Sequence, residues 1–474
     1  MFDAWKERRR LRLENRPERT VFHNIFATMM LVLVVELLMA AVSILAVNVT
    51  GKLDENAKDL LTMRVRNRAS YVEDILQNAE DLTPLSEQIN TTTQQMLQSG
   101  AISLDTLDAS SEQSNALLVA LAPQLVDTLR EKQVTGIFIM LNTHDLDTCE
   151  VGKKMPGIYL RDQDPDARPS ERNSDLLLER ASATVVKELG IGTDKGWQPA
   201  FPYQANTKGG ILRTVFQTAY KDGARLSAEN YGRWTTNSYC LAGDDRNAIA
   251  YSIPLILPDG TVYGVVGVEL LTEYLQTKLP FMELDEDKAG TYFIVSTTDA
   301  PTDGVLTLRK TVTSGEDLVT ADAPLGVLHC RSDGNGGNWL ELNDKRYYMV
   351  LEPLQLYNRN TPFSGEKWFL AGTMEQSVLL AFSDRVREVL LATILVTLVL
   401  SVLGSLLISA RLASPINHLY REVIDAQEKK TFPQLSRTAI REVDRFAETI
   451  TELNKELVTN STKFLRIMDM ASVE

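Results

Sequence analysis

Alternating apolar and polar positions in the middle of the chain predict a β-hairpin. Two apolar segments, 248–257 and 261–271, flank the tripeptide Pro258-Asp259-Gly260, which supplies a fixed φ angle and a residue that tolerates positive φ. The large residues of the first segment alternate with smaller or polar ones: they are Ile249, Tyr251, Ile253 and Leu255. The second segment is rich in β-branched residues and reaches Glu269 at its end, where a carboxylate at the rim of a strand predicts part of a ligand cup.

The pattern before the hairpin predicts a long helical entry into a sheet. Residues 53–80 and 82–133 have helix-compatible sequences, with a polar break around 110–115. Strands are expected at 136–143 and 157–162. The stretch 163–235, rich in Pro, Asp, Asn and Gly, is expected to form an irregular flap that contains a helix at 176–189.

The pattern after the hairpin predicts a short helix at 271–279 and then a second antiparallel sheet. Its strands are expected at 290–296, 305–313, 338–354 and 367–374. The predicted fold class is therefore α+β, with two modules in tandem, the first at about 130–280 and the second at about 281–380.

Apolar segments of membrane-spanning length lie near both ends of the chain, at 25–47 and 389–409. At about 1.5 Å per residue, each can cross a hydrocarbon core of about 30 Å. Basic residues precede the first segment and acidic residues follow it, which predicts a cytoplasmic N-terminus. Residues 48–388 are then extracellular, and both tails, 1–24 and 410–474, are cytoplasmic. A cleaved signal peptide is the alternative for the first segment, although its apolar run exceeds the usual length.

The C-terminal tail shows helical spacing and a heptad seam. The seam steps by three and four residues through Val443, Phe446, Ile450, Leu453, Leu457, Asn460, Phe464 and Ile467. A two-helix unit of this size cannot bury such a stripe alone, so we expect a parallel homodimer that forms a four-helix bundle.

Composition excludes several classes of protein. With 44% hydrophobic and 24% charged residues, the chain is neither disordered nor collagenous. The net charge of −14 is concentrated in the middle of the chain, which excludes a nucleic-acid-binding surface there. The three cysteines form no CxxC pair, and four histidines are too few to favour a His-ligated metal centre. We therefore expect no metal and no cofactor.

Residues 50–385 resemble the extracellular double Cache sensors of bacterial receptors. The likeness rests on TYFIVSTTD and on AIAYSIPLILPDGTVYGVVGVELL, because the family's membrane-distal module ends in a G-V-x-G-x-[DE] strand. Residues 410–457, with Pro415 opening the first helix, resemble a HAMP relay, although Glu442-Val443-Asp444 replaces the family's Glu-[Ile/Leu]-Gly. Residues 458–474 resemble the coiled-coil linker that leads into PAS or diguanylate cyclase modules. The resemblance implies two PAS-like modules that sense a small molecule.

The output of such a receptor is not encoded in this stretch. The sequence contains no GGDEF-type loop, histidine kinase boxes, P-loop or methylated chemoreceptor hairpin. The effector is either a separate protein or missing by truncation, and we expect truncation. A diguanylate cyclase is the first expectation, and a chemoreceptor or histidine kinase output is the alternative.

The resemblance implies a ligand site in the distal module, where family members use an Arg-x-Trp pair for a carboxylate and a terminal acid for an ammonium. The candidate residues are Tyr231, Arg233, Trp234, Tyr239, Asp245, Tyr251 and Glu269. A guanidinium, several aromatic rings and an acid suit an amine or an amino acid. The alternative is that Trp234 and Tyr239 are ordinary core aromatics and that Arg233 pairs with Asp244 or Asp245 on the surface.

Two other functional classes fit the sequence less well. An extracellular enzyme would need a paired nucleophile and base, and no Ser-His or Cys-His constellation is evident. An adhesin would not need the cytoplasmic heptads. A receptor without catalytic residues is therefore the expected function.

The predicted topology can be tested by cysteine labelling in intact cells. In a background without the three native cysteines, an impermeant thiol reagent should label a cysteine at position 115 and spare cysteines at positions 5 and 455. The reverse labelling pattern would contradict the whole interpretation.

Overall fold

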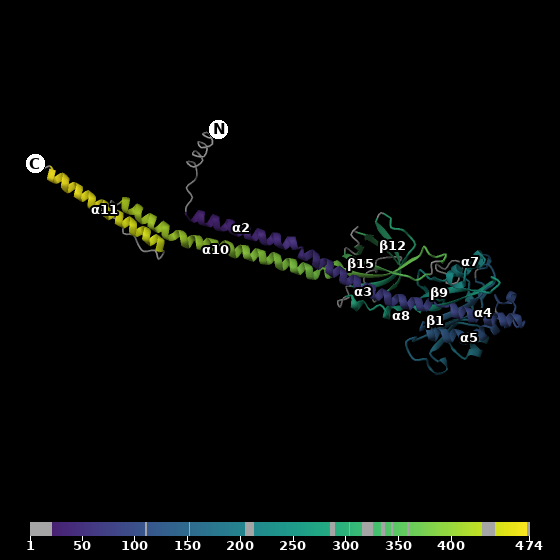
Figure 1. Ribbon diagram of the computed structural model, residues 1–474. Helices are drawn as coiled ribbons and strands as arrows, with labels where there is room; N and C mark the ends of the chain where they lie inside the picture. The colour runs from purple at the N-terminus through teal and green to yellow at the C-terminus, as the bar shows by residue number, and fades with distance from the viewer. Residues whose placement is uncertain are drawn as a thin grey trace, which may run out of the picture. The chain divides into compact units, whose positions relative to one another are not determined.

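The computed structural model describes residues 21–109, 111–150, 152–203, 213–284, 290–302, 304–314, 326–332, 337–342, 345–357, 360–428 and 441–471. The chain forms two compact units (Figure 1). One unit combines Met1–Leu53 with Phe382–Glu474, and the other comprises Asp54–Ala381. Most of the predicted cytoplasmic N-terminus (1–20) and the connector of the predicted HAMP-like relay (429–440) lie outside the described residues.

Three long helices open the second unit: α3 (Val49–Glu80), α4 (Thr83–Gln98) and α5 (Glu112–Lys132). Pro84 in the first turn of α4 suits a helix start, because its missing N–H would lack a partner there. At the start of α5, Ser111 and Ser114 exchange side-chain to backbone hydrogen bonds and form a capping box. The break between α4 and α5 therefore covers 99–111 and begins earlier than predicted.

An eight-stranded sheet follows, which we call the sheet module. Its order is β5-β4-β3-β1-β10-β9-β7, with β8 paired to β9. The strands are β1 (Gly136–Leu141), β3 (Gly157–Asp162), β4 (Leu176–Arg180), β5 (Gly192–Gln198), β7 (Arg233–Trp234), β8 (Tyr239–Cys240), β9 (Asn247–Ile256) and β10 (Val262–Leu271). A separate small sheet pairs β2 (Lys154–Met155) with β6 (Phe201–Pro202).

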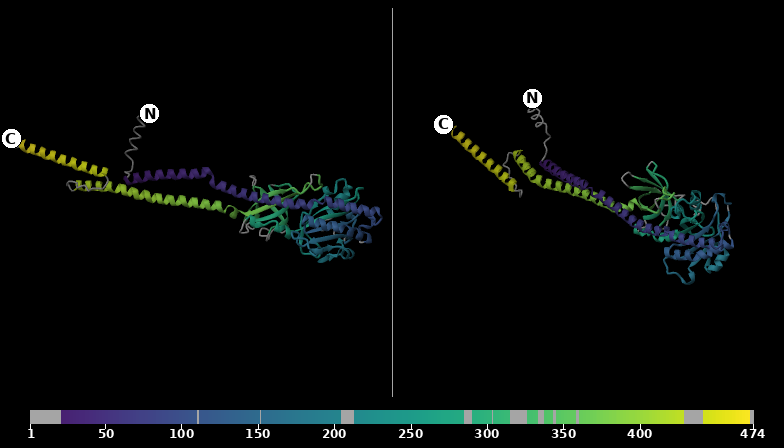
Figure 2. Two further views of the ribbon diagram at one scale, coloured as in Figure 1. Left: turned by 60° about the horizontal axis from the view of Figure 1, so that its bottom comes forward. Right: turned by 45° about the vertical axis from the view of Figure 1, so that its right-hand side comes forward.

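Each face of this sheet has its own apolar core. One face packs against α3, α4 and α5, as Figures 1 and 2 show. The other packs against α7 (Arg213–Asp222) and loop residues, through side chains such as Phe138, Tyr159 and Phe216. Because side chains alternate between faces along a strand, neighbouring residues of β9 and β10 belong to different cores.

The predicted central hairpin is confirmed. Strands β9 and β10 pair antiparallel, and Gly260 in the turn has φ +86°. The Gly260 N–H donates to the carbonyl of Leu257 at 2.9 Å and closes the turn. The predicted helix after the hairpin is α8 (Thr272–Thr277).

The helix predicted at 176–189 is wrong in its first half. Residues Leu176–Arg180 form β4, which pairs antiparallel with β3, and the helix is restricted to α6 (Ala183–Leu189). The Ser182 side chain accepts a hydrogen bond from the Val185 N–H and starts the helix there. Short apolar runs fit a buried strand and a buried helix equally well, which explains the error.

The barrel module is a closed barrel of six antiparallel strands. They are β11 (Gly290–Thr297), β12 (Val305–Thr313), β13 (Val327–Ser332), β14 (Asn338–Leu342), β15 (Lys345–Leu354) and β16 (Lys367–Glu375). The predicted second set of antiparallel strands is present, but β13 was not predicted, and the segment 338–354 is two strands. Pairing of β11 with β16 closes the barrel, which strand patterns alone do not reveal.

Helix α3 contacts both modules. Its buried side chains share one apolar core with the sheet module and with barrel residues such as Tyr292 and Trp368. At the barrel, Val65 approaches Gly372 so closely that a Cβ at Gly372 would lie 2.2 Å from Val65 Cγ2. Glycine in β16 therefore permits the contact between α3 and the barrel.

The remaining elements are short helical turns and the helices of the first unit. The 3-10 turns are η1 (Leu104–Thr106), η2 (Leu146–Thr148), η3 (Glu171–Asn173), η4 (Ala228–Tyr231) and η5 (Phe281–Glu283). The barrel is followed by α9 (Gln376–Leu379), and the first unit contains α2 (Val21–Val47), α10 (Ala381–Glu428) and α11 (Arg441–Ala471).

Among the described residues, one helix is long and apolar enough to cross a membrane, at Ala381–Ala426 in α10. It contains the predicted span 389–409. The predicted span 25–47 falls in α2, where Ile25–Ala40 is a shorter apolar helix. Helix α10 continues through Pro415, so this proline does not open a separate helix as predicted. The described part of the heptad seam is helical in α11.

Three large apolar side chains of the α11 seam are exposed in a single chain. Phe446, Leu453 and Leu457 retain 65%, 55% and 65% of their accessible surface. Burying such a stripe against a second copy would remove it from water. The predicted homodimer supplies that second copy.

Cross-linking tests this predicted dimer. In a background without native cysteines, cysteines at Ile450 or Leu457 should form disulfides between subunits faster than a cysteine at the outward position Glu448. Equal rates at the three positions would show that the seam is not a dimer interface.

Candidate functional site

A buried ion pair between neighbouring strands forms the centre of the candidate site. Arg161 on β3 donates from Nε to Glu269 Oε1 at 2.7 Å and from Nη2 to Glu269 Oε2 at 2.9 Å. Both side chains are at most 1% exposed. The geometry is bidentate, which is the strongest arrangement for a guanidinium and a carboxylate.

Gly136 explains why this pair can form. It lies on β1, between β3 and β10, and its backbone pairs with Arg161 on one side and with Glu269 on the other. A Cβ at Gly136 would lie 2.8 Å from Glu269 Oε1. The missing side chain therefore leaves space for the two charged groups to meet across the middle strand.

Other charged residues extend the pair into a network, which we call the charge cluster. Arg161 Nη1 donates to Glu179 Oε1 at 3.0 Å and also to Asp244. Arg246 donates to the same Glu179 oxygen at 2.7 Å and to Asp244 Oδ1 at 2.8 Å. Strands β3, β4 and β10 and the loop after β8 are thereby joined through charged hydrogen bonds.

The cluster contains one more carboxylate than guanidinium groups. Arg246 also binds Asp194 on β5, and the buried Arg180 donates to the backbone carbonyls of Gly196 and Ala242 at 2.9 and 2.8 Å. The carboxylates are Glu179, Asp194, Asp244 and Glu269, and the guanidinium groups are those of Arg161, Arg180 and Arg246. With every group ionised, the cluster carries a net negative charge.

Two tyrosine hydroxyl groups complete the surroundings of Glu269. The hydroxyl oxygens of Tyr159 and Tyr239 lie 2.8 Å apart, and both hydroxyls bind Glu269 Oε2, that of Tyr239 at 3.3 Å. Burial and the negative charge of Glu269 raise the pKa of both phenols well above the usual value. Both tyrosines therefore stay protonated and act as donors to the carboxylate.

The acids of the cluster differ in their pKa values. Burial raises the pKa of Glu179 to about 7, and the neighbouring Asp194 acts in the same direction. Among the described residues, Glu179 Oε2 is buried without a hydrogen-bond partner. Burial also disfavours the charge of Asp244, but hydrogen bonds from Arg246 and Arg161 lower the pKa of Asp244 to about 2. Glu179 is thus the acid whose charge changes near neutral pH.

The structure brings some predicted site residues together in this cluster. Glu269 and Tyr239 are in direct contact, and exposed Asp245 donates its N–H to Asp244 Oδ1 at 2.9 Å at the cluster's edge. Tyr231 lies in the apolar core on the same side of the sheet, where its hydroxyl binds Asp222.

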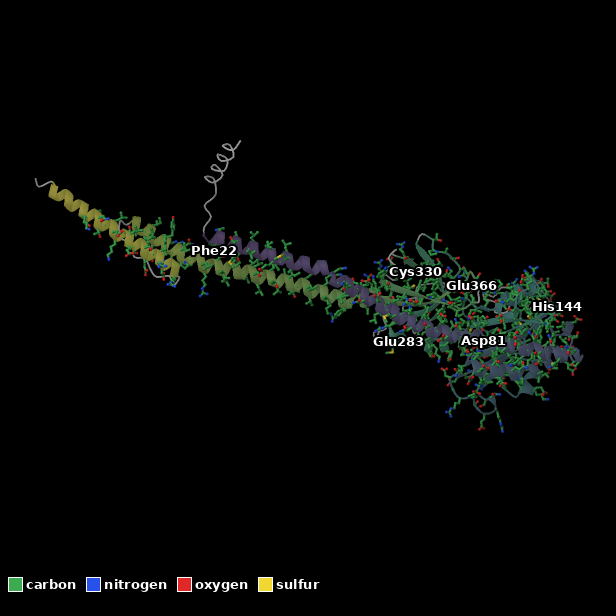
Figure 3. The ribbon with its side chains drawn as sticks, viewed as in Figure 1. Phe22, Asp81, His144, Glu283, Cys330 and Glu366 are labelled. Carbon is green, nitrogen blue, oxygen red and sulfur yellow. The ribbon has the colours of Figure 1, made fainter. Side chains whose placement is uncertain are left out.

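The other predicted site residues lie elsewhere. Trp234 and Tyr251 stack with ring centroids 5.5 Å apart in the helix-facing core. Arg233 donates from Nε to Glu366 at 3.0 Å, a residue of the loop before β16 that Figure 3 labels. The alternative that paired Arg233 with Asp244 or Asp245 is therefore wrong.

Tyr159, Arg161 and Glu179 were not predicted. The signal for the first two is present in GIYLRD, because Tyr159 and Arg161 are two residues apart on a strand and so share one face. Glu179 has no comparable signal, since its strand was predicted as part of a helix.

Glu179 makes folding stability depend on pH. The pKa of Glu179 is about 7 in the folded chain and about 4.5 as its ordinary value, so between these values the folded state binds more protons. Its contribution is therefore lost as pH rises from about 4.5 to 7. Glu179→Gln removes this pH dependence. The free energy of unfolding of Glu179→Gln minus that of the native chain should therefore rise by about 2 kcal/mol from pH 5 to pH 8, as measured by urea titration.

The control for this measurement is Glu188→Gln, which removes an exposed carboxylate from α6. Its free energy of unfolding should follow that of the native chain at every pH. A difference between Glu179→Gln and the native chain that stays constant with pH would contradict the assignment.

Comparisons with known proteins give matches among solved structures. No protein-family model matches the chain, and no curated protein matches it. The extracellular domain of the putative histidine kinase soHK1S-Z6 aligns with 14% identity and TM-score 0.38, over 70% of this chain and 98% of that one. The ligand-binding domain of the Pseudomonas fluorescens chemoreceptor CtaA, in complex with L-isoleucine, aligns with 13% identity and TM-score 0.34, over 70% and 98%.

A further match is the periplasmic sensory domain of the Campylobacter jejuni chemoreceptor Tlp1, with 13% identity and TM-score 0.38 over 69% of this chain and 98% of that one. These neighbours are sensor domains of chemoreceptors and of a histidine kinase. At such identities and scores, the comparison specifies neither a ligand nor an output for this chain.

Proposed function

We propose that the chain is a membrane-anchored receptor that binds an extracellular small molecule in its sheet module and transmits the event to the cytoplasm. The observation that carries the proposal is the connection of the folded unit to apolar helices at both of its ends. Helix α3 begins two residues after α2, and Leu380 alone separates α9 from α10. A change in the packing of α3 or β16 therefore acts directly on the chain segments that would cross the membrane.

The charge cluster supports an amine or an amino acid as the first class of ligand. Its excess carboxylate favours a ligand that carries an ammonium group. An α-amino acid could exchange the Arg161–Glu269 pair for two new pairs, its carboxylate with Arg161 and its ammonium with Glu269. Such an exchange leaves no buried charge without a partner, which would otherwise cost several kcal/mol.

The cytoplasmic part of the proposal concerns residues 410–474. The exposed seam of α11 supports a dimer whose helix packing carries the signal to an output domain or protein. A HAMP-like relay and a diguanylate cyclase output are the specific forms that we propose, with a chemoreceptor or histidine kinase output as the alternative. The proposal assigns no catalytic step to residues of this chain.

Ligand binding tests the extracellular part of the proposal. The full chain in lipid nanodiscs should show a higher unfolding temperature with at least one member of a panel of amino acids and amines. For that ligand, Glu269→Gln should lower the affinity about 10- to 100-fold, because a charge-assisted contact is lost. Arg161→Gln should cause a similar loss only for a ligand with a carboxylate. Calorimetry measures both affinities.

The control variant is Glu283→Gln, which removes another glutamate that is paired with an arginine, Arg68, but is partly exposed. Its affinity for the ligand should equal that of the native chain. Unchanged affinity in Glu269→Gln, with the native unfolding transition retained, would contradict a ligand site at the charge cluster.

A further inference from the structure

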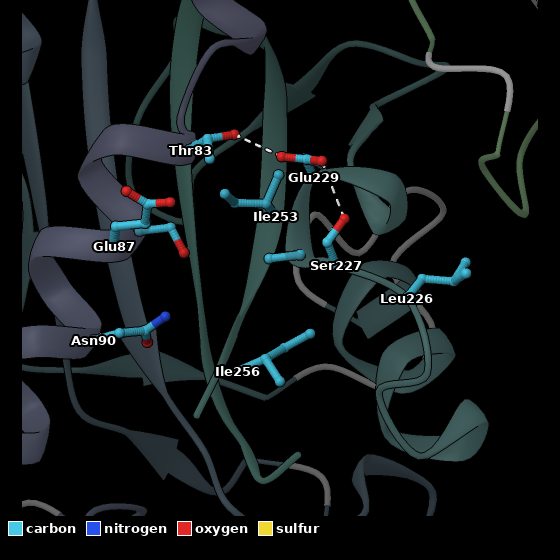
Figure 4. Close-up of a pocket in the computed structure, with 10 residues that line it drawn as sticks. Thr83, Glu87, Asn90, Leu226, Ser227, Glu229, Ile253 and Ile256 are labelled. Carbon is cyan, nitrogen blue, oxygen red and sulfur yellow. Dashed lines mark hydrogen bonds between the residues drawn. The ribbon is translucent and has the colours of Figure 1, made fainter. Parts of the chain in front are cut away.

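Two adjacent cavities lie apart from the charge cluster, and no residue of the cluster lines either of them. The first, of about 410 Å³, is located between α4, the η4 segment and β9 (Figure 4). The second, of about 320 Å³, is bounded by the end of α3, by Tyr251 and by the barrel-module residues Gln355, Leu356, Tyr357 and Thr361. Thr83 and Glu229 line both cavities, and Thr83 Oγ1 donates to Glu229 Oε2 at 3.1 Å.

Carboxylates dominate the charge around the second cavity. Glu80, Asp81 and Glu229 line it. Lys132 binds Asp81 at 3.2 Å, whereas Glu229 accepts hydrogen bonds from the neutral hydroxyls of Thr83 and Ser227. Arg233 brings no net charge to the neighbourhood, since it is paired with Glu366.

Among the described residues, Glu80 has no cationic partner. It accepts a hydrogen bond from the Trp234 indole Nε1 at 2.7 Å, which brings no positive charge. Burial raises the pKa of Glu80 to about 8, and the negative charge of Glu73 adds to this effect. A cation in the cavity would stabilise the ionised form and lower that pKa.

The Tyr251 hydroxyl is a second polar feature of this cavity. Tyr251 is 5% exposed and lines the second cavity, and its hydroxyl has no hydrogen-bond partner within the described part of the chain. Burial and then the charges of Glu80, Glu229 and Asp81, which line the same cavity, raise the pKa of this phenol. Gly232 leaves it room, because a Cβ there would lie 1.8 Å from the hydroxyl oxygen.

Aromatic and apolar side chains make the cavities suitable for an organic cation. Tyr251 and Tyr357 line the second cavity, and aromatic faces attract ammonium groups. Ile253, Ile256 and Leu226 line the first cavity and would accept an aliphatic chain. Among the described residues, no group of three or more His, Cys, Asp or Glu side chains could hold a metal ion.

We propose that these two cavities form a binding site for an organic ammonium ion, with the cationic group among Glu80, Glu229 and Tyr251 and an aliphatic part toward Ile253. The site is separate from the charge cluster and does not depend on Glu269. The lining residues come from α3, α4, the sheet module and the barrel module, so a ligand there would contact all four.

Affinity at this site should rise with pH. The ligand needs an ionised Glu80, so its affinity increases as pH rises to about 8 and is constant above that pH. Below about pH 8, binding of the ligand releases a proton from Glu80. The other charged or titratable side chains at or near the two cavities are Glu73, Asp81, Glu87, Lys132, Glu229, Tyr251 and Tyr357.

The test is calorimetry on the full chain in nanodiscs with 1,4-diaminobutane as the probe. The diamine should bind, more tightly at pH 8.5 than at pH 6.5, and neutral 1,4-butanediol should not bind. Glu80→Gln keeps an oxygen for the Trp234 indole and should lower the affinity at least tenfold. Tyr251→Phe and Gly232→Ala should also weaken binding, the second by filling the space at the hydroxyl.

Glu273→Gln, which removes an exposed carboxylate from α8, is the matched control and should bind the diamine as the native chain does. Native affinity in Glu80→Gln and in Gly232→Ala would overturn the proposal, as would no binding at millimolar diamine. Loss of binding in Glu269→Gln together with native affinity in Glu80→Gln would assign the cation to the charge cluster instead.

Discussion

The burial of Arg161 is the constraint on which the sheet module depends. A guanidinium that is 1% exposed is stable only with its charge compensated, and Glu269, Glu179 and Asp244 surround it. These acids come from β10, β4 and the loop after β8, so one side chain joins parts of the chain that are more than 100 residues apart. The requirement also explains Gly136, which leaves space for the pair, and the tyrosines that donate to Glu269.

The period of the β-strand explains why the predicted site residues separate into two groups. In the β9–β10 register, Glu269 lies opposite Ala250, and Val268 lies opposite Tyr251. Side chains one residue apart point to opposite faces, so Tyr251 faces the helices while Glu269 faces the charge cluster. Trp234 on β7 pairs with Tyr251 and shares its face. The family resemblance implies one pocket for these residues, whereas the register places them on two faces of the sheet.

Local patterns predicted the hairpin, the long helices and the apolar helix α10, because each depends on periodicity within one segment. The misassigned β4 has a run of three leucines, Leu176–Leu178, that fits either a strand or a helix, and its pairing with β3 decides the outcome. Two other features join residues that are far apart in sequence. Strands β11 and β16 pair to close the barrel, and Arg233 contacts Glu366. No local pattern contains such information, and Arg161 was missed for the same reason: its partners lie on other strands.

The charge cluster and Glu80 lie on different elements of the same folded unit. The charge cluster contacts β10, which leads into α8, whereas Glu80 is the last residue of α3. Helix α3 contacts β16 at Gly372 without space for even a Cβ, so a displacement of the helix there must move the strand or change its packing. Strand β16 leads through α9 into α10, so the strand that α3 contacts at Gly372 continues in the chain toward the apolar helix.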